Sequence, residues 1–186
     1  TFSTGGLHTC VLTPHGDVEC WGAVTYGGLS HPSGTYSEVS AGLEQSCAVS
    51  TAGDLECWGV GVPVPLPTSD GLTSIAVGLD HGCGLTADGF AVCWGDDTHG
   101  QATPPPLAVF RTLVAGNNHT CGLQASGVVL CWGHPDQANG VPPSVFIQIE
   151  SSSLHTCGVT NQHSVECWGG SNTHGEATAP LLGTYQ

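Results

Sequence analysis

An internal repeat runs through the whole chain. The motif C-x9-C-W-G occurs five times, and successive copies begin 36 to 38 residues apart, at Cys10, Cys47, Cys83, Cys121 and Cys157. A short signature, G-x-x-H in its commonest form, precedes the first cysteine of each copy. Repeats of this length are typical of proteins in which each unit is one small supersecondary element that buries its apolar face against its neighbours. The sequence therefore predicts an array of similar units.

Each motif has the pattern of a β-hairpin. Apolar residues alternate on both sides of turn sequences such as residues 13–17, Thr-Pro-His-Gly-Asp. Folding about that turn places the two cysteines of a motif opposite each other on one face. Ten cysteines form an even number without any C-x-x-C spacing, which favours disulfides over a zinc or redox site. We predict the pairs Cys10–Cys20, Cys47–Cys57, Cys83–Cys93, Cys121–Cys131 and Cys157–Cys167.

The tryptophan that follows each second cysteine points to the opposite face of the hairpin, because neighbouring residues of a strand alternate. A strand pair that is apolar on both faces must be covered on both faces, as in a sheet stacked between two others. We therefore predict interblade packing for Trp21, Trp58, Trp94, Trp132 and Trp168. An exposed aromatic ladder for sugars is the alternative.

The aligned columns, G-x-x-H-[TSG]-C-x-[LV]-x(3,4)-G-x-[VL]-x-C-W-G, resemble the regulator-of-chromosome-condensation repeat, and most closely its cysteine-bearing extracellular relatives. The resemblance implies a β-propeller, usually of seven blades that are each a small antiparallel sheet. We expect an all-β fold of five tandem antiparallel blades of 36–39 residues, either an open superhelical stack or a closed five-bladed ring. A single domain, 1–186, would divide near 1–38, 39–74, 75–112, 113–148 and 149–186.

The two ends of the sequence are in phase with the repeat. If Gln186 were followed by Thr1, Tyr185 and Phe2 would have the same separation as Tyr36 and Val39. We therefore predict that Tyr185 and Phe2 meet at one end-to-end junction. In a ring they would meet within one chain, and in an open stack they would meet between two copies. We favour head-to-tail self-association, since five blades are few for the family.

The charge of the chain excludes several functions. Fifteen acidic residues stand against one basic residue, Arg111, which gives a formal net charge of −14. Binding of nucleic acid needs lysine and arginine, so nucleic-acid partners are excluded, and no apolar run is long enough to insert into a membrane. The exchange-factor activity known in the family is not expected either. No residues that match it are identifiable.

Two rows of polar residues raise the question of metal binding. His8, His81, His119 and His155 occupy one column, but Gln45 interrupts it, and the resemblance implies that this position ties backbone groups together. Glu19, Glu56 and Glu166 share another position, either as a solvated face or as a calcium cross-bridge. Neither row has an established ligand motif, so we predict no metal, no cofactor and no catalytic residue.

The disulfides place the chain in an oxidising compartment, and we expect an extracellular protein, secreted or at the cell surface. Asn118-His119-Thr120 is a possible N-glycosylation sequon, and proline-rich loops near 65–69, 103–106 and 177–180 could carry other glycans. No signal peptide is visible, so a mature or excised segment is expected. The favoured function is structural or adhesive, as the repeating unit of a fibre. The alternative is a closed propeller whose loop face binds a protein or glycan, and an enzyme is the third hypothesis.

Overall fold

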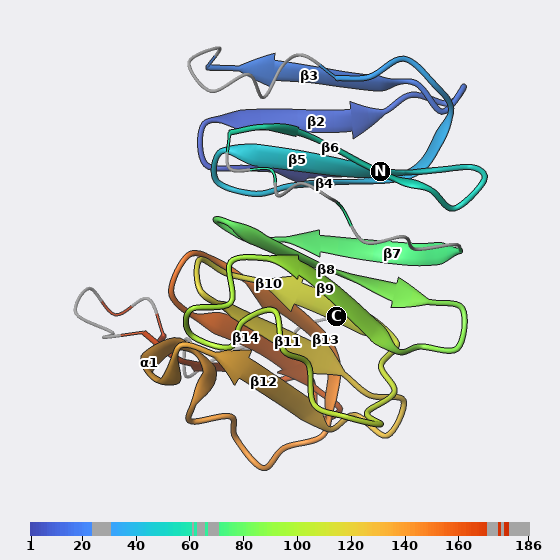
Figure 1. The fold of residues 1–186 in the computed structure, drawn as a ribbon. Coiled ribbons are helices and arrows are strands. Elements are labelled where there is room, and N and C mark those ends of the chain that lie inside the picture. The colour runs from blue at the N-terminus through green and yellow to red at the C-terminus, as the bar shows by residue number, and fades with distance from the viewer. Residues whose placement is uncertain are drawn as a thin grey trace.

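The chain folds into five small antiparallel sheets that follow one another along the sequence (Figure 1). The computed structural model describes all residues except 24–30, 61, 63–65, 67–70, 171–174, 176 and 179–186. Each sheet, called a blade below, has three described strands in chain order, with the first strand innermost. The predicted all-β fold of five antiparallel blades is confirmed.

The strands have these bounds. Blade 1 contains β1 (Phe2–Thr4), β2 (His8–Leu12) and β3 (Val18–Gly22). Blade 2 contains β4 (Tyr36–Ala41), β5 (Gln45–Ser50) and β6 (Leu55–Gly59). Blade 3 contains β7 (Leu72–Val77), β8 (His81–Thr86) and β9 (Ala91–Gly95). Blade 4 contains β10 (Thr112–Ala115), β11 (His119–Leu123) and β12 (Val129–Gly133). Blade 5 contains β13 (Phe146–Ser151), β14 (Thr156–Thr160) and β15 (Val165–Trp168).

The second and third strands of every blade form the hairpin that the sequence indicates. In blade 1, Cys10 lies directly opposite Cys20. The tip closes with a backbone hydrogen bond from Gly16 to Thr13, and Gly16 adopts φ +86°, which a glycine reaches without steric cost. The five disulfides are the five predicted pairs, and each spans one hairpin: Cys10–Cys20, Cys47–Cys57, Cys83–Cys93, Cys121–Cys131 and Cys157–Cys167.

The core is divided into four apolar clusters, one between each pair of successive blades. Between blades 1 and 2, Tyr36, Val39 and Trp58 of blade 2 pack on Cys10 and Val18 of blade 1. We call the face that carries the disulfide the trailing face of a blade, and the face that carries the tryptophan its leading face. Each cluster therefore joins the trailing face of one blade to the leading face of the next.

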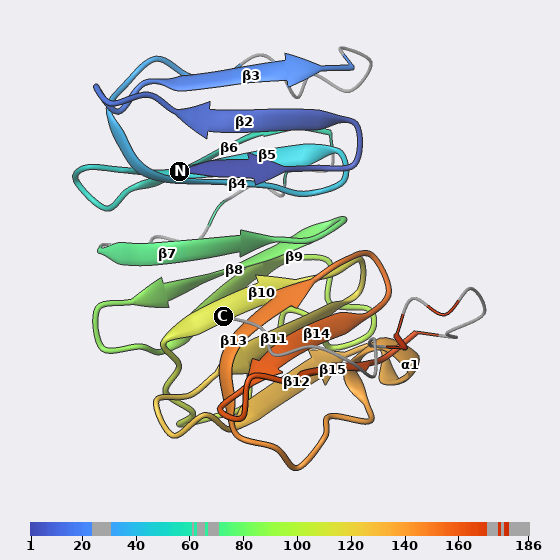
Figure 2. The same ribbon diagram turned by 180° about the vertical axis from the view of Figure 1, so that it is seen from behind.

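The blades follow an arc around a common axis, from blade 1 at the top of Figures 1 and 2 to blades 4 and 5 at the bottom. The inner loops of the five blades line an axial cavity of about 250 Å³, to which Gly5, Gly42, Gly78, Gly116 and Ser152 contribute. Among the described residues, no apolar cluster joins blade 5 to blade 1. The described chain is thus an open arc with two uncovered ends.

The blades begin slightly earlier than the divisions expected from the sequence. Each of blades 2 to 5 begins one to three residues before the expected division, so that division falls inside or at the start of its first strand: 38/39, 74/75, 112/113 and 148/149. A short helix, α1 (Pro135–Ala138), lies between β12 and β13, and His134 caps its first turn by accepting from the Asp136 N–H. Within the described residues, no helix combines the length and hydropathy needed to span a membrane.

Candidate interaction interface

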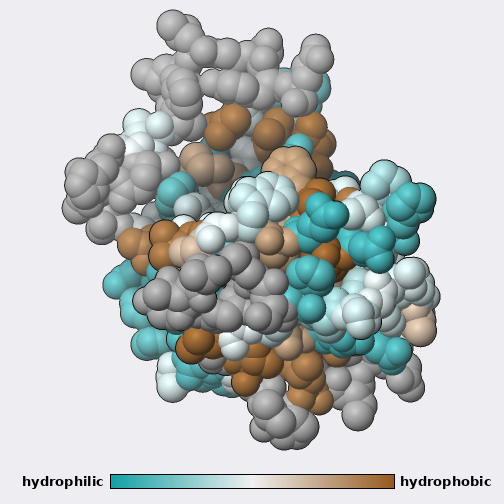
Figure 3. All heavy atoms as spheres, turned by 90° about the horizontal axis from the view of Figure 1, so that it is seen from above, coloured by the Kyte–Doolittle hydropathy of each residue, from teal (hydrophilic) through white to brown (hydrophobic). Residues whose placement is uncertain are grey.

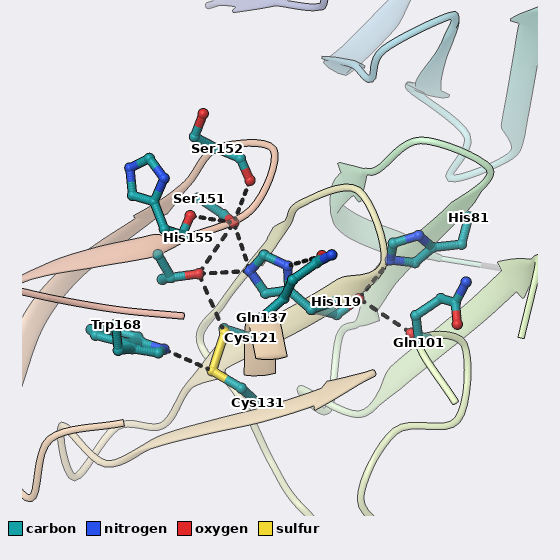
Figure 4. Close-up of a disulfide and its surroundings, with 12 residues drawn as sticks. His81, Gln101, His119, Cys121, Cys131, Gln137, Ser151, Ser152, His155 and Trp168 are labelled. Carbon is teal, nitrogen blue, oxygen red and sulfur yellow. Dashed lines mark hydrogen bonds between the residues drawn. A yellow bond between two sulfur atoms is a disulfide. The ribbon is translucent and has the colours of Figure 1, made fainter. Parts of the chain in front are cut away.

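The junction between blades 4 and 5 shows how one blade recognises the next (Figure 4). Trp168 on the leading face of blade 5 is only 3% exposed and packs on Phe146 with ring centroids 5.3 Å apart. Its indole N–H points at Cys131 Sγ, 3.4 Å away, in the disulfide of blade 4. Trp58, Trp94 and Trp132 are also buried at the junctions before their blades. Four of the five predicted tryptophans therefore lie in interblade packing.

A buried polar contact accompanies the apolar packing at three of the four junctions. His119 Nε2 lies 2.9 Å from Thr156 Oγ1 of the next blade, and His81 Nε2 lies 2.9 Å from Thr120 Oγ1 (Figure 4). His8 Nε2 lies 2.6 Å from Ser46 Oγ. In each case the hydroxyl belongs to the residue directly after the next blade's own His or Gln. We call this pair of side chains the latch.

The junction between blades 2 and 3 replaces both partners of the latch at once. Gly82 stands where the other following blades have a hydroxyl, and Gln45 stands where the others have His. The Gln45 amide donates to the backbone carbonyls of Leu79 and His81, at 3.2 and 3.4 Å. The amide side chain thus bonds to backbone where no hydroxyl is present. Equivalent positions of the junctions are therefore occupied by one of two combinations, which are His with a hydroxyl residue or Gln with Gly.

Three histidines of the column, His8, His81 and His119, form structural contacts between blades. Burial lowers the pKa of His8, His81 and His119, and it lowers the pKa of His81 to about 4. The other ring nitrogen of His119 lies 3.2 Å from Gln137 Oε1 (Figure 4). Across the described part of the chain, no three His, Cys, Asp or Glu side chains gather in a group that could hold a metal ion.

The neutral state of His81 predicts an acid-sensitive fold. The unfolded chain binds a proton on this residue near pH 6.5, whereas the folded chain does so only near pH 4. The contribution to stability is therefore complete above pH 6.5 and is lost as the pH falls towards 4, by about 3 kcal/mol. His81→Gln should reduce this loss in urea titrations across that range. The control is His15→Gln, at an exposed position in a turn. The prediction would be contradicted if the free energy of unfolding had the same pH dependence in the wild type and in His81→Gln.

Within the part of the chain that the structure describes, no blade packs on the leading face of blade 1, whereas every other leading face has a partner. Trp21 is 55% exposed and Phe2 is 72% exposed, whereas their counterparts in blades 2 to 5 are buried. Thr9, in the hydroxyl position of the latch, is partly exposed. Figure 3 looks onto the molecule from this side and shows apolar atoms at the surface among polar ones. This end of the arc therefore exposes a leading face, which at the internal junctions packs on the trailing face of the preceding blade.

The trailing face of blade 5 presents the other half. A shallow and almost entirely apolar pocket of about 220 Å³ lies over Cys157, Val159 and Val165. Cys157 is partly exposed, although the first cysteines of the other four blades are fully buried. His155, which occupies the latch histidine position in blade 5, is also only partly buried. The two ends of the arc thus expose the two kinds of face that meet at the internal junctions.

The predicted glutamate row has unlike surroundings along the array. Glu19 and Glu56 are both exposed, but Glu56 accepts a hydrogen bond from the Tyr36 hydroxyl at 3.0 Å. Glu166 is partly buried and accepts a hydrogen bond from the Ser144 hydroxyl at 2.8 Å. Burial, followed by the hydrogen bond to Glu56, raises the pKa of Tyr36 to about 12. Two of the three carboxylates therefore serve local contacts within the protein.

The remaining predicted residues occupy varied settings. Asn118 is partly buried, and its backbone bonds to Gln137 and His134, while Thr120 of the same sequon is fully buried in a latch. Tyr185 lies outside the described residues, so its contact with Phe2 stays a prediction. Of the proline-rich loops, 103–106 is described throughout, 65–69 lies mostly outside the described residues, and 177–180 is described only at 177 and 178.

Comparison with known proteins now decides the type of repeat. Residues 72–101 and 110–139 match the family described as the Regulator of chromosome condensation (RCC1) repeat. These segments cover the strands and following loops of blades 3 and 4. The chain is an RCC1-type repeat β-propeller. No curated protein matches the chain at the sequence level.

Solved structures place this RCC1-type chain beside plant receptor ectodomains. The CRINKLY WD40 ectodomain of the Arabidopsis thaliana receptor kinase ACR4 superposes with a TM-score of 0.77 at 26% identity, over 96% of this chain and 67% of that one. The entire ectodomain of the Physcomitrella patens receptor kinase CR4 gives 0.76 at 30% identity, over 89% of this chain and 50% of that one. Prp20p from Saccharomyces cerevisiae gives 0.77 at 17% identity, over 97% and 59%, and shares the fold. The RCC1-type chain thus spans half to two thirds of the length of these structures.

Proposed function

We propose that this chain is a non-enzymatic structural module of the extracellular space that assembles head to tail through its two end faces, as the repeating unit of a fibre. One observation carries the proposal. The exposed leading face of blade 1 and the exposed trailing face of blade 5 are the separated halves of the junction that recurs four times within the chain. Contacts that pair unlike faces and do not close on themselves produce filaments.

Two further observations support the extracellular and structural parts of the proposal. All ten cysteines are paired in five disulfides, which persist in oxidising compartments. The similar plant structures are ectodomains of receptor kinases by their own descriptions. Repeat arrays whose units touch only their neighbours also suit a mechanical role, since each added unit extends the same contact.

Assembly should depend on one residue of each end face. Trp21→Asp places a charge on the leading face of blade 1, and Val165→Asp places one in the apolar pocket of blade 5. Each variant alone should remain monomeric at concentrations at which the wild type forms chains, because desolvating an unpaired carboxylate opposes burial. An equimolar mixture should form one-to-one dimers, since each variant keeps one intact face. Sedimentation velocity measures all four samples, and negative-stain images show the filaments.

The matched control is Phe90→Asp, because the Phe90 side chain is exposed and lies outside both end faces. This variant should assemble like the wild type. Circular dichroism checks that each variant is folded. A wild type that stays monomeric at all concentrations would contradict the proposal. That result would favour instead a single particle that binds another partner through its faces or loops.

A further inference from the structure

We infer that the contact between two copies includes a latch between His155 of one copy and Thr9 of the next. The inference rests on the proposed head-to-tail assembly and identifies the polar group that sets its register. It follows from the internal junctions, where a histidine on one blade meets a hydroxyl on the blade after it. His155 and Thr9 are the two latch residues at the ends of the arc.

The burial of the two residues fits this assignment. The latch histidines His8, His81 and His119 are buried, and the latch hydroxyls of Ser46, Thr120 and Thr156 are fully buried. His155 and Thr9 are both only partly buried. They precede cysteines of the same column, Cys157 and Cys10, by the same spacing as their internal counterparts. Docking the trailing face of blade 5 on the leading face of blade 1 would cover both.

A second polar contact beside the latch also occurs at internal junctions, and its two partners at the ends of the arc lie apart. In this contact a side-chain oxygen of one blade accepts a backbone N–H of the next blade. Ser3 Oγ accepts the N–H of Ala41 in the next blade at 2.9 Å, and Ser40 Oγ accepts the N–H of Val77 at 3.2 Å. In the register of blade 5 the same position, opposite the first cysteine, belongs to Glu150, which is exposed. A carboxylate is a stronger acceptor than a hydroxyl. At the intermolecular junction Glu150 would receive the N–H of Thr4, which corresponds to Ala41.

The junction between blades 2 and 3 supplies the means to test the latch. There Gln45 donates to two backbone carbonyls and Gly82 takes the place of the hydroxyl, while Gln45 Oε1 is buried without a partner among the described residues. Transferring this pair to the ends gives His155→Gln and Thr9→Gly. Either change alone pairs a residue of one combination with a residue of the other. Both changes together recreate the Gln and Gly combination that the chain already has between blades 2 and 3.

The experiment compares head-to-tail association of wild type, His155→Gln, Thr9→Gly and the double variant by sedimentation velocity over a range of concentrations. Each single change should weaken association about tenfold, because one buried polar group loses its partner. The double variant should recover affinity to within about threefold of the wild type. The exposed replacement His15→Gln controls for loss of an imidazole away from the faces and should leave association unchanged.

The outcomes separate the latch from the assembly itself. If the wild type associates but the single variants associate equally well, the latch is wrong and the head-to-tail contact stands. If the double variant is weaker than either single variant, the two residues do not face each other, and the latch is again overturned. If the wild type does not associate at all, the proposed function and the latch fail together.

Discussion

Replacing Trp168 with alanine should lower the free energy of unfolding by about 3 to 5 kcal/mol, the usual cost of truncating a large buried aromatic side chain. Trp168 fills the junction between blades 4 and 5, where it packs on Phe146 and meets the disulfide of blade 4. Because a domain of this kind is stable by only 5 to 15 kcal/mol, on the order of a third or more of its stability is at stake. Urea unfolding followed by circular dichroism measures the loss.

Trp21→Ala is the matched control, since Trp21 has the same sequence context and strand position but is 55% exposed. In a dilute monomeric sample its replacement should cost less than about 1 kcal/mol. The difference between the two losses in free energy of unfolding gives the contribution of the interblade contact, apart from the general preference of tryptophan for β-strands. Equal losses for Trp168→Ala and Trp21→Ala would show that the interblade contact does not carry the stability assigned to it.

Reduction of the five disulfides should leave the chain unfolded at about 37 °C. Each disulfide closes a loop with a sequence separation of 10 residues, and opening one such loop costs about 3 kcal/mol in the chain-entropy account. The five losses do not add fully, but together they exceed what four small apolar clusters can sustain. The test is to reduce the chain in denaturant, alkylate it, remove the denaturant and record circular dichroism.

The control is a sample carried through the same denaturant and alkylating agent without reductant, which should refold. The double variant Cys121→Ser with Cys131→Ser separates one disulfide from the other four and should lose about 3 kcal/mol in urea. A fully alkylated chain that still unfolds cooperatively on heating would show that the blades are held by packing alone.

The sequence predicted the hairpins and their cysteine pairs because both depend on residues close together in the chain. The members of each pair are 10 positions apart in the sequence, and in blade 1 a turn that contains Thr13, Gly16 and Asp17 fixes the register between them. Interblade packing of four tryptophans was also predictable, since a hairpin that is apolar on both faces must lie between neighbours. The confirmed fold class follows from these local rules applied five times.

The differences among equivalent residues were not predictable in the same way. The exposure of Trp21 depends on which blade precedes it, and the repeat pattern treats all five tryptophans alike. The latch hydroxyls were present in the sequence as the [TSG] column, and the joint change to Gln45 and Gly82 was a visible signal of contact between blades. Reading that signal requires knowing which face of one blade meets which face of the next. Helix α1 is too short to give a periodic pattern.

The disulfides also determine how the array would respond to a pulling force. Each one bridges the second and third strands of a blade, so tension entering at Cys10 would cross directly to Cys20 and bypass the turn between them. The ten residues of one hairpin could otherwise extend by about 35 Å. A stretched chain would therefore lengthen through its inner strands and the loops between blades. The hairpin tips would carry no load and keep their shape at forces that separate the blades.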